Sequence, residues 1–411
     1  MLKAKTASDK GDTLLGKSLV PIIDLAHCGT EECPVKSVVN RVAQQLGKAL
    51  SEKGMALLVN HGISDEKLKT AWDHLDDFCE LSTDVKEHYI RSGETKHGYV
   101  QPLRRKSDGN APELRHAFNI CTLNSKNLPE EPLPGFADHI STLATEFKAL
   151  ARFVLQSLAV SLEIPQTFFL EKHSHMLSGE NDNETILRLL YYPPIIEEDD
   201  KDEHIKGRCK YTYQKCLTEM PDFKPEEDPR EQRKESLEKE QEEKEKKEAE
   251  NKDVLDMAST SKEFLNGHVT RSNAHTDYGT FTLLVQDSEG GLEVQLPGSE
   301  KWQRVGHLPG AILIFCGEIL SIWTQERYSA LQHRVVIPEQ EHLRIRGRHS
   351  IAFFCHPDNV TMISPNDLPQ SAVAENTTTK KTRKKSFKAA KERVYNAYQM
   401  IQKRIKDSYS S

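Results

Sequence analysis

The segment RSNAHTDYGTFTLLVQD, residues 271–287, places a histidine and an aspartate two residues apart at the head of an apolar run. Residues i and i+2 of a β-strand project to the same face, so His275 and Asp277 would point together while Thr276 points away. A neutral imidazole and a carboxylate on one side provide part of a metal site. The apolar residues behind them predict a buried strand over residues 281–287. The segment therefore predicts a metal centre carried by β-structure.

A third ligand has to come from another strand that faces the same interior. His333, in the segment LQHRVVIP, is the best candidate because apolar residues flank it on both sides. Two histidines and one carboxylate form the ligand set of non-haem Fe(II) oxygenases, which leaves metal positions open for a co-substrate and oxygen. The competing interpretation is that a His-x-Asp pair arises by chance, and a buried histidine is more often a core residue with its hydrogen bonds satisfied.

A second polar pair favours the metal site over that alternative. Arg348 and Ser350, in RHSIAFF, again occupy positions i and i+2 of an apolar strand. A guanidinium beside a hydroxyl suits a carboxylate, because the bidentate pair fixes orientation as well as charge. Tyr192, just before two prolines, could add a hydroxyl to the same site. Arg344 and Arg346 compete for the role, but only Arg348 has a serine two residues on and leads directly into the apolar strand.

The apolar pattern changes along the chain. The first part predicts helices at 35–54, 65–82 and 139–162, with Gly54 as a C-cap and Ser64 as an N-cap. The second part is composed of short strands separated by Gly and Pro, which is typical of a sandwich or jelly roll. The predicted strands are residues 20–25, 55–60, 184–194, 281–287, 292–296, 311–317, 330–338 and 348–357.

Six motifs follow one another in an order that resembles a known enzyme family. They are VPIIDL, LLVNHGIS, LRLLYYPP, HTDYGTFTLLVQD, LQHRVV and RHSIAFF. The chain is similar over residues 18–365, apart from an insertion, to the isopenicillin N synthase-like family of 2-oxoglutarate- and Fe(II)-dependent dioxygenases. The resemblance implies an α+β fold, mainly β in its core: a double-stranded β-helix, or jelly roll, with surrounding helices.

The resemblance also implies roles for individual residues. His275, Asp277 and His333 would be the ligands of Fe(II). Arg348 and Ser350 match the Arg-x-Ser motif that holds the distal carboxylate of 2-oxoglutarate, and Tyr192 matches the tyrosine that assists them. One departure is that Arg348 follows His333 at a longer interval than the family usually shows.

The implied reaction is the oxidation of a small molecule, by hydroxylation or otherwise, with conversion of 2-oxoglutarate and O2 to succinate and CO2. One alternative is an iron-dependent oxidase of the same fold that does not use 2-oxoglutarate. Another is a non-catalytic scaffold that docks through a charged insertion. The complete ligand triad argues against the scaffold, which has no need to retain it.

The insertion is the second departure from the family pattern. Residues 229–251 contain only two aliphatic side chains, Leu237 and Ala249. Such a segment cannot bury enough surface to join a core, so we expect a solvent-exposed insertion, disordered or helical, with docking of a protein partner as the less common alternative. The expected divisions are a flexible N-terminus (1–17), a helix-rich N-terminal region (18–180), a catalytic core (181–365) interrupted by the insertion at about 196–265, and a basic tail or helix (366–411).

Bulk properties narrow the class of protein. The formal net charge is −7 and 29% of residues are charged, which does not favour nucleic acid as a partner. No apolar run reaches membrane-spanning length and no signal-peptide pattern opens the chain, so we expect a cytoplasmic protein. The basic cluster at 380–386 makes nuclear import the alternative. The eight cysteines are scattered, which predicts free thiols.

Overall fold

The computed structural model describes residues 14–15, 20–26, 28, 35–91, 96–102, 115–123, 127–179, 181–194, 270–337, 347–373 and 395–410. The charged insertion, the basic cluster at 380–386, Arg344 and Arg346 lie outside these ranges.

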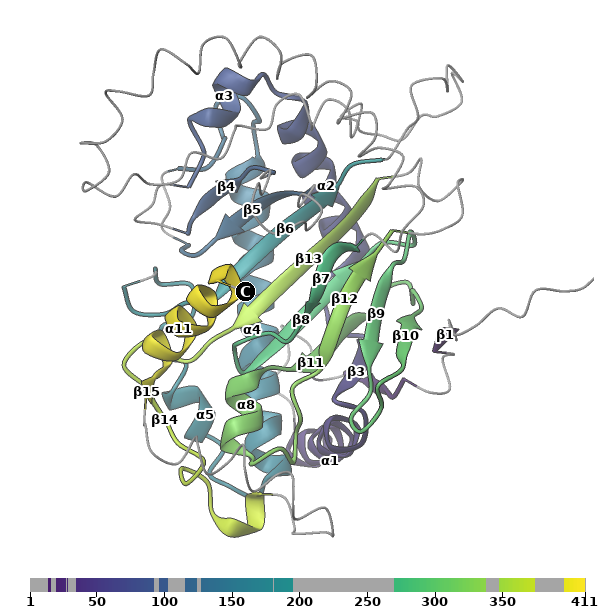
Figure 1. Ribbon diagram of the computed structural model, residues 1–411, viewed down its shortest axis with the longest axis vertical. Helices are drawn as coiled ribbons and strands as arrows, with labels where there is room; N and C mark the ends of the chain where they lie inside the picture. The colour runs from purple at the N-terminus through teal and green to yellow at the C-terminus, as the bar shows by residue number, and fades with distance from the viewer. Residues whose placement is uncertain are drawn as a thin grey trace, which may run out of the picture.

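Two β-sheets face each other at the centre of the molecule (Figure 1). The larger sheet contains, in spatial order, β2 (Ile22–Asp24), β3 (Met55–Val59), β11 (Ile312–Cys316), β8 (Phe281–Gln286), β13 (Arg348–Cys355), β6 (Ile186–Tyr192), β5 (His116–Ile120) and β4 (Gly98–Val100). The smaller sheet contains β1 (Leu14–Leu15), β10 (Trp302–Val305), β9 (Leu292–Gln295), β12 (Gln332–Val336) and β7 (Thr270–His275). The expected jelly-roll core with surrounding helices is confirmed.

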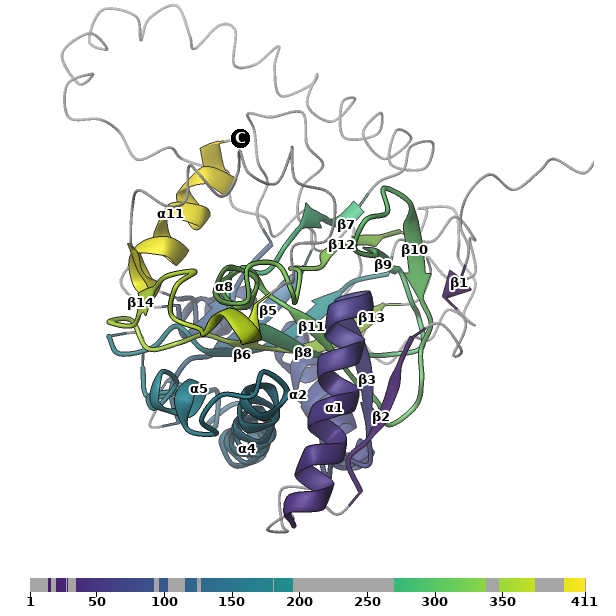
Figure 2. The ribbon, with the colours of Figure 1, turned by 90° about the horizontal axis from the view of Figure 1, so that it is seen from below.

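Helices cover the outer face of the larger sheet. Figure 2 shows α1, α2, α4 and α5 on one side of that sheet and the smaller sheet on the other. The helices are α1 (Lys36–Lys53), α2 (Asp65–Glu80), α3 (Thr83–Glu87), α4 (Phe136–Ser161), α5 (Phe168–Glu171), α8 (Glu318–Trp323) and α11 (Ala397–Ser410), with a 3-10 turn η1 at Gln370–Ala372.

Both predicted caps are confirmed. Gly54 ends α1 with a φ of 70° and donates its N–H to the Leu50 carbonyl, a backbone conformation in which a side chain is unfavourable. The Ser64 hydroxyl accepts the Lys67 N–H at the start of α2 at 3.3 Å. These signals are local, which is why the sequence alone reveals them.

The larger sheet is buried on both faces, with alternate residues in two separate apolar clusters. Leu189 and Tyr191 of β6 join the cluster against the helices, whereas Leu190 and Tyr192 join the cluster between the two sheets. Because side chains alternate along a strand, the same strands hold the helices on one side and face the barrel interior on the other. Tyr192 therefore points into the barrel.

The strands of the first part of the chain join the same sheet as those of the second. β3 pairs with β11 and β5 pairs with β6, so the helix-rich region and the predicted core share one continuous sheet. The strands β4, β5, β7 and β10 are not among the predicted ones. The polar sequence TRSNAH of β7 shows no apolar alternation, and its strand conformation depends on pairing with β12.

The described part of the C-terminal tail contains a short strand and a helix. Tyr395–Asn396 forms strand β15, paired with β14 (Met362–Ile363), and α11 follows at Ala397. The Asn396 side chain accepts the Gln399 N–H at 2.8 Å and so caps the helix. Ala397 and Ile401 are buried, so α11 packs on the core.

A half-buried histidine between two carboxylates ties the helices to β13. His349 Nε2 lies 2.5 Å from Asp76 Oδ1 of α2, and His349 Nδ1 lies 3.5 Å from Asp287 Oδ2 at the end of β8. Burial by itself would lower the pKa of His349, but the hydrogen bonds and charges of Asp287 and Asp76 outweigh it and raise the pKa to about 9. His349 stands between Arg348 and Ser350, so this link holds the strand that carries both.

We expect this link to make stability depend on pH. A histidine whose pKa rises from 6.5 to about 9 on folding contributes stability that is fully present below pH 6.5 and is lost as the pH rises through 9. The contribution is on the order of 3 kcal/mol. Denaturant unfolding of the wild type and Asp76→Asn should give a stability difference that is largest near pH 6 and shrinks toward pH 10. The exposed Glu66→Gln on the same helix is the control, and a difference independent of pH would contradict the expectation.

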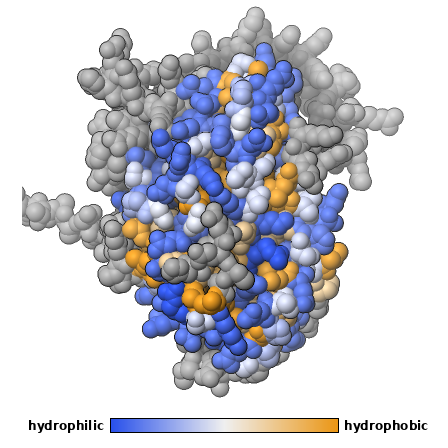
Figure 3. Space-filling view, turned by 180° about the vertical axis from the view of Figure 1, so that it is seen from behind, coloured by the Kyte–Doolittle hydropathy of each residue, from blue (hydrophilic) through white to orange (hydrophobic). Residues whose placement is uncertain are grey.

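The face shown in Figure 3 has no large apolar patch, because hydrophobic side chains are scattered there among hydrophilic ones.

Among the described helices, none combines the length and the apolar character needed to cross a membrane. The described cysteines are buried and form no disulfide, in agreement with the scattered thiols that the sequence predicts: Cys28, Cys79, Cys121, Cys316 and Cys355.

Candidate metal and co-substrate site

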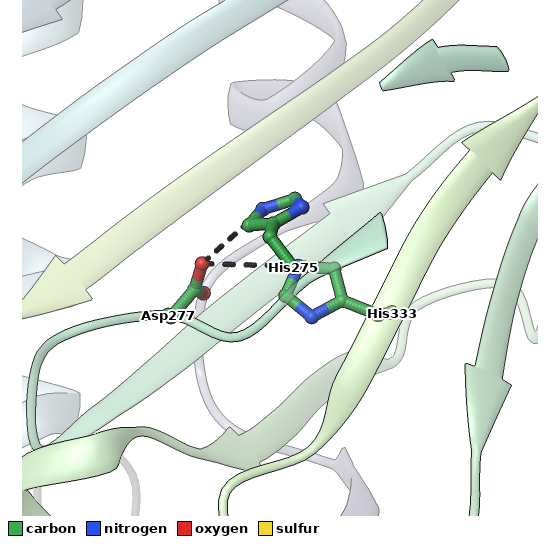
Figure 4. Close-up of side chains that lie close together, drawn as sticks. All are labelled: His275, Asp277 and His333. Carbon is green, nitrogen blue, oxygen red and sulfur yellow. Dashed lines mark ion pairs between the residues drawn. The ribbon is translucent and has the colours of Figure 1, made fainter. Parts of the chain in front are cut away.

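The structure brings the three predicted metal ligands together. His275 ends β7 and pairs with His333 of β12 across the smaller sheet. His275 Nε2 lies 3.6 Å from Asp277 Oδ1, and His333 Nε2 lies 3.7 Å from the same oxygen (Figure 4). One ligand atom from each residue lies within 4.8 Å of the others, which is compatible with a single ion held between them.

Asp277 reaches this position from a turn, and the expectation of one strand carrying both His275 and Asp277 is wrong in that detail. Strand β7 ends at His275, and Asp277 follows in an irregular segment. The backbone there is tightly packed: a Cβ on Gly279 would lie 2.5 Å from the Cys355 carbonyl, and one on Gly317 would collide with the Gly279 carbonyl. Glycine at both positions lets the chain turn back sharply and present the carboxylate to the two histidines.

Second hydrogen bonds orient each ligand. His275 Nδ1 lies 2.7 Å from the Asn273 carbonyl, and His333 Nδ1 lies 3.1 Å from the Leu331 carbonyl. A carbonyl only accepts, so each Nδ1 carries the proton and each Nε2 presents its lone pair toward Asp277. These are the outer hydrogen bonds that metal-binding histidines need, and their partners were not visible in the sequence.

The carboxylate is oriented in the same way. The Thr282 hydroxyl of β8 donates to Asp277 Oδ2, which leaves Oδ1 facing the histidines. Two imidazole nitrogens with free lone pairs and one carboxylate oxygen are donors that Fe(II) accepts, so the residues present fit this metal.

His333 is held neutral. Burial, with a smaller contribution from the neighbouring His275, lowers the pKa of His333 to about 4, against the opposing effect of Asp277. The ring of Phe315 lies 4.7 Å from that of His333, between centroids, and helps to exclude water. At neutral pH the ring therefore keeps a lone pair for a metal instead of a second proton.

The predicted carboxylate clamp lies where β6 and β13 pair. Arg348 stands opposite Tyr192 in this ladder, and both are buried, with Arg348 only 1% exposed. Arg348 Nη1 donates to the Ser350 hydroxyl at 3.2 Å. The guanidinium carbon lies 5.5 Å from the centre of the Tyr192 ring. Arg348, Ser350 and Tyr192 thus gather at one point in the barrel, and Arg344 and Arg346 lie outside the described residues.

Two further groups hold Arg348 and were missed in the sequence. Arg348 Nε donates to the Gly290 carbonyl at 2.7 Å, and Nη2 donates to Gln286 Oε1 at 3.3 Å. Gln286 lies opposite Ser350 in the pairing of β8 with β13. In the sequence, Gln286 is noticeable only as a polar residue at the end of an otherwise apolar strand. That it contacts Arg348 depends on the pairing of β8 with β13.

The C-terminal helix is linked to the candidate metal ligands through α8. Glu318 accepts a hydrogen bond from the Thr276 hydroxyl at 2.6 Å and pairs with Arg404 of α11 at 2.7 Å. Its backbone N–H also donates to the Asp277 carbonyl at 2.9 Å. Thr276, which lies between His275 and Asp277, is therefore anchored to α8 and, through Glu318, to α11.

Comparisons with known proteins agree with this geometry. The family model described as the 2OG-Fe(II) oxygenase superfamily matches residues 253–357, and the one described as non-haem dioxygenase in morphine synthesis N-terminal matches residues 20–137. The first range contains all three candidate ligands and the Arg348–Ser350 pair.

Similar proteins cover most of the chain. The 2-oxoglutarate-dependent dioxygenase frbA of Dothideomycetidae sp. (strain 11243) is 24% identical over 80% of this chain and 84% of its own. A 1-aminocyclopropane-1-carboxylate oxidase of Dictyostelium mucoroides is 22% identical over 84% of each. The solved structure of a full-length Neurospora crassa protein in complex with alpha-KG and thymine shares the fold, with a TM-score of 0.65 at 19% identity over 99% of this chain and 100% of that one. The chain belongs to the 2OG-Fe(II) oxygenase superfamily and is a dioxygenase that depends on Fe(II) and 2-oxoglutarate.

Proposed function

We propose that His275, Asp277 and His333 bind Fe(II), and that Arg348, Ser350 and Tyr192 bind the distal carboxylate of 2-oxoglutarate. The observation that carries the assignment is the convergence of two Nε2 lone pairs and one carboxylate oxygen, each oriented by its own second hydrogen bond. The product would be an oxidised small molecule, with succinate and CO2 formed from 2-oxoglutarate and O2. Fe(II), when bound, supplies the redox chemistry by which O2 oxidises the co-substrate and the substrate.

The protein's own residues bind and orient the co-substrate and remove it from water. The Arg348 guanidinium is held by three acceptors before any ligand arrives, so it loses little conformational freedom when a carboxylate binds. Its positive charge is buried where β6 and β13 pair, and it favours a dianionic keto acid over a monoanionic one. The apolar residues between the two sheets, among them Leu284, Val294 and Ala352, surround the site with a medium of low polarity.

Turnover of purified protein tests the proposal. With Fe(II), O2 and 2-oxoglutarate, we expect succinate to form, and to disappear when either the metal or 2-oxoglutarate is left out. Absence of succinate above background over a broad panel of small molecules, with iron shown to be bound, would sink it. Substrate oxidation without 2-oxoglutarate would instead favour an iron-dependent oxidase.

A protein partner at the charged insertion and the cellular compartment stay predictions. Deletion of residues 229–251 would locate docking in the insertion if a binding partner were lost while succinate formation continued. Import through the basic cluster at 380–386 is the alternative to a cytoplasmic location.

A further inference from the structure

A second arginine lies in the barrel without a role in the proposed site. Arg271 belongs to β7, the strand that ends at His275, and its side chain is only 6% exposed. Its Nη2 is buried and has no hydrogen-bond partner among the described residues. A buried guanidinium without an anion is costly, because it has lost hydration and gained no opposite charge. The environment reflects this cost: burial, followed by the charge of Arg348, lowers the pKa of Arg271 to about 10.

Both arginines flank the same aromatic ring. The guanidinium carbon of Arg271 lies 5.8 Å from the centre of the Tyr192 ring, and that of Arg348 lies 5.5 Å from it. Arg348 comes from β13 in the larger sheet, whereas Arg271 comes from β7 in the smaller one. Two cations from opposite sheets therefore lie near the same ring, and the charge of Arg348 acts on Arg271.

No acid of the described residues forms a hydrogen bond with either guanidinium group, although the charge of Asp287 acts on both. The acidic group whose charge acts on Arg271 is Asp287, and its Oδ2 already accepts the His349 N–H at 2.5 Å and lies 3.5 Å from the His349 ring. Arg348 is held by neutral acceptors: a carbonyl, a hydroxyl and an amide oxygen. Among the described residues, the two guanidinium groups therefore have no carboxylate hydrogen-bonded to them, and a bound anion would supply one.

A strand irregularity explains why Arg271 points inward. The register between β12 and β7 shifts between His333 and Val335 and again between Val335 and Val336. A bulge of this kind places consecutive residues out of simple alternation, and Arg271 and its neighbour Ser272 are both buried. Bulges re-aim side chains near functional sites, and this one sends a guanidinium from the ligand-bearing strand toward Tyr192.

We propose that Arg271 is a second binding residue for the distal carboxylate of 2-oxoglutarate, which it contacts from β7 while Arg348 contacts it from β13. A carboxylate has about four acceptor positions, enough for both guanidinium groups and the Ser350 hydroxyl. The inference rests on the proposed function, because it takes Arg348 to be the primary carboxylate residue. It also links the binding of 2-oxoglutarate to the binding of iron, since β7 carries both Arg271 and the proposed metal ligand His275.

The affinity of the Fe(II)-loaded full chain for two keto acids, measured by calorimetry without oxygen, tests this. One is 2-oxoglutarate, and the other is 2-oxopentanoate, which has a methyl group in place of the distal carboxylate. We expect Arg271→Leu to weaken 2-oxoglutarate binding by about 10- to 100-fold and to leave 2-oxopentanoate binding unchanged, because only the first ligand reaches the guanidinium. Arg271→Lys, which keeps the charge, should recover most of the loss, and Arg152→Leu, an exposed arginine of α4, should change neither.

Two outcomes would overturn the inference: wild-type affinity of Arg271→Leu for 2-oxoglutarate, or an equal loss for both keto acids, which would show general damage to the barrel. Arg348→Leu separates this from failure of the proposed function. If Arg348→Leu loses 2-oxoglutarate binding and Arg271→Leu does not, the proposed site stands and the role of Arg271 falls. If neither variant loses it, the proposed carboxylate site itself is wrong.

Discussion

Asp277→Ala is expected to abolish Fe(II) binding and, with it, succinate formation. Asp277 Oδ1 is the point at which the site converges, 3.6 Å from one histidine nitrogen and 3.7 Å from the other. It is also the only candidate ligand of the three that brings a negative charge to the metal, since histidine binds metals through the lone pair of a neutral imidazole. Loss of a group that merely orients a ligand costs about 10- to 100-fold in metal affinity, so loss of the ligand itself should cost about 100-fold or more.

The iron content of the purified variant after dialysis, and a titration of the apoprotein with Fe(II), would measure the effect. Because Thr282 loses its acceptor in this variant, circular dichroism and thermal unfolding have to show that the protein still folds. Asp182→Ala, which removes an exposed carboxylate, is the matched control and should bind iron like the wild type. Wild-type iron affinity in Asp277→Ala would refute the ligand assignment.

Arg348→Leu is expected to raise the KM for 2-oxoglutarate by roughly 30- to 5000-fold while iron binding stays intact. Truncating one partner of a buried charge pair costs about 2–5 kcal/mol, which corresponds to that range of affinity. The reason is geometric as well as electrostatic, because three acceptors aim the Arg348 fork before the co-substrate binds. Arg348→Lys keeps the charge but not the fork, so it should lie between the wild type and the leucine variant.

Steady-state rates over a range of 2-oxoglutarate concentrations would give the KM, and calorimetry would give the affinity directly. Arg346→Leu is the control that the sequence itself suggests, since Arg346 competed with Arg348 for the role. A steep rise of KM in Arg346→Leu, with Arg348→Leu close to wild type, would show that the wrong arginine was assigned.

Helix caps and the periodicity of apolar residues explain which elements of the fold could be predicted from the sequence. Gly54 and Ser64 mark helix ends through interactions within a few residues, so they can be read without knowing the fold. The apolar runs of β8, β11 and β13 are buried on both faces and stand out in composition alone. By contrast, β7 is polar and becomes a strand only because β12 lies beside it.

The same distinction applies to the site. His275, Asp277 and His333 are predicted as metal ligands from residue type, spacing and resemblance, because metal chemistry restricts which side chains can serve. The hydrogen bonds that orient them come from Asn273, Leu331 and Thr282. Two of these are backbone carbonyls, which carry no sequence signal, so their role could not be predicted.

The sequence by itself determined the class of fold and predicted the candidate metal ligands and the candidate carboxylate motif, because each depends on short-range spacing and on the chemistry of single side chains. Only the tertiary structure decided how these groups meet. Pairing between β6 and β13 places Tyr192 opposite Arg348, and the irregular register of β7 on β12 brings Arg271 to the same ring. Strand neighbours and register are contacts between distant parts of the chain, set by how both sheet faces are buried together, and no single segment contains that information.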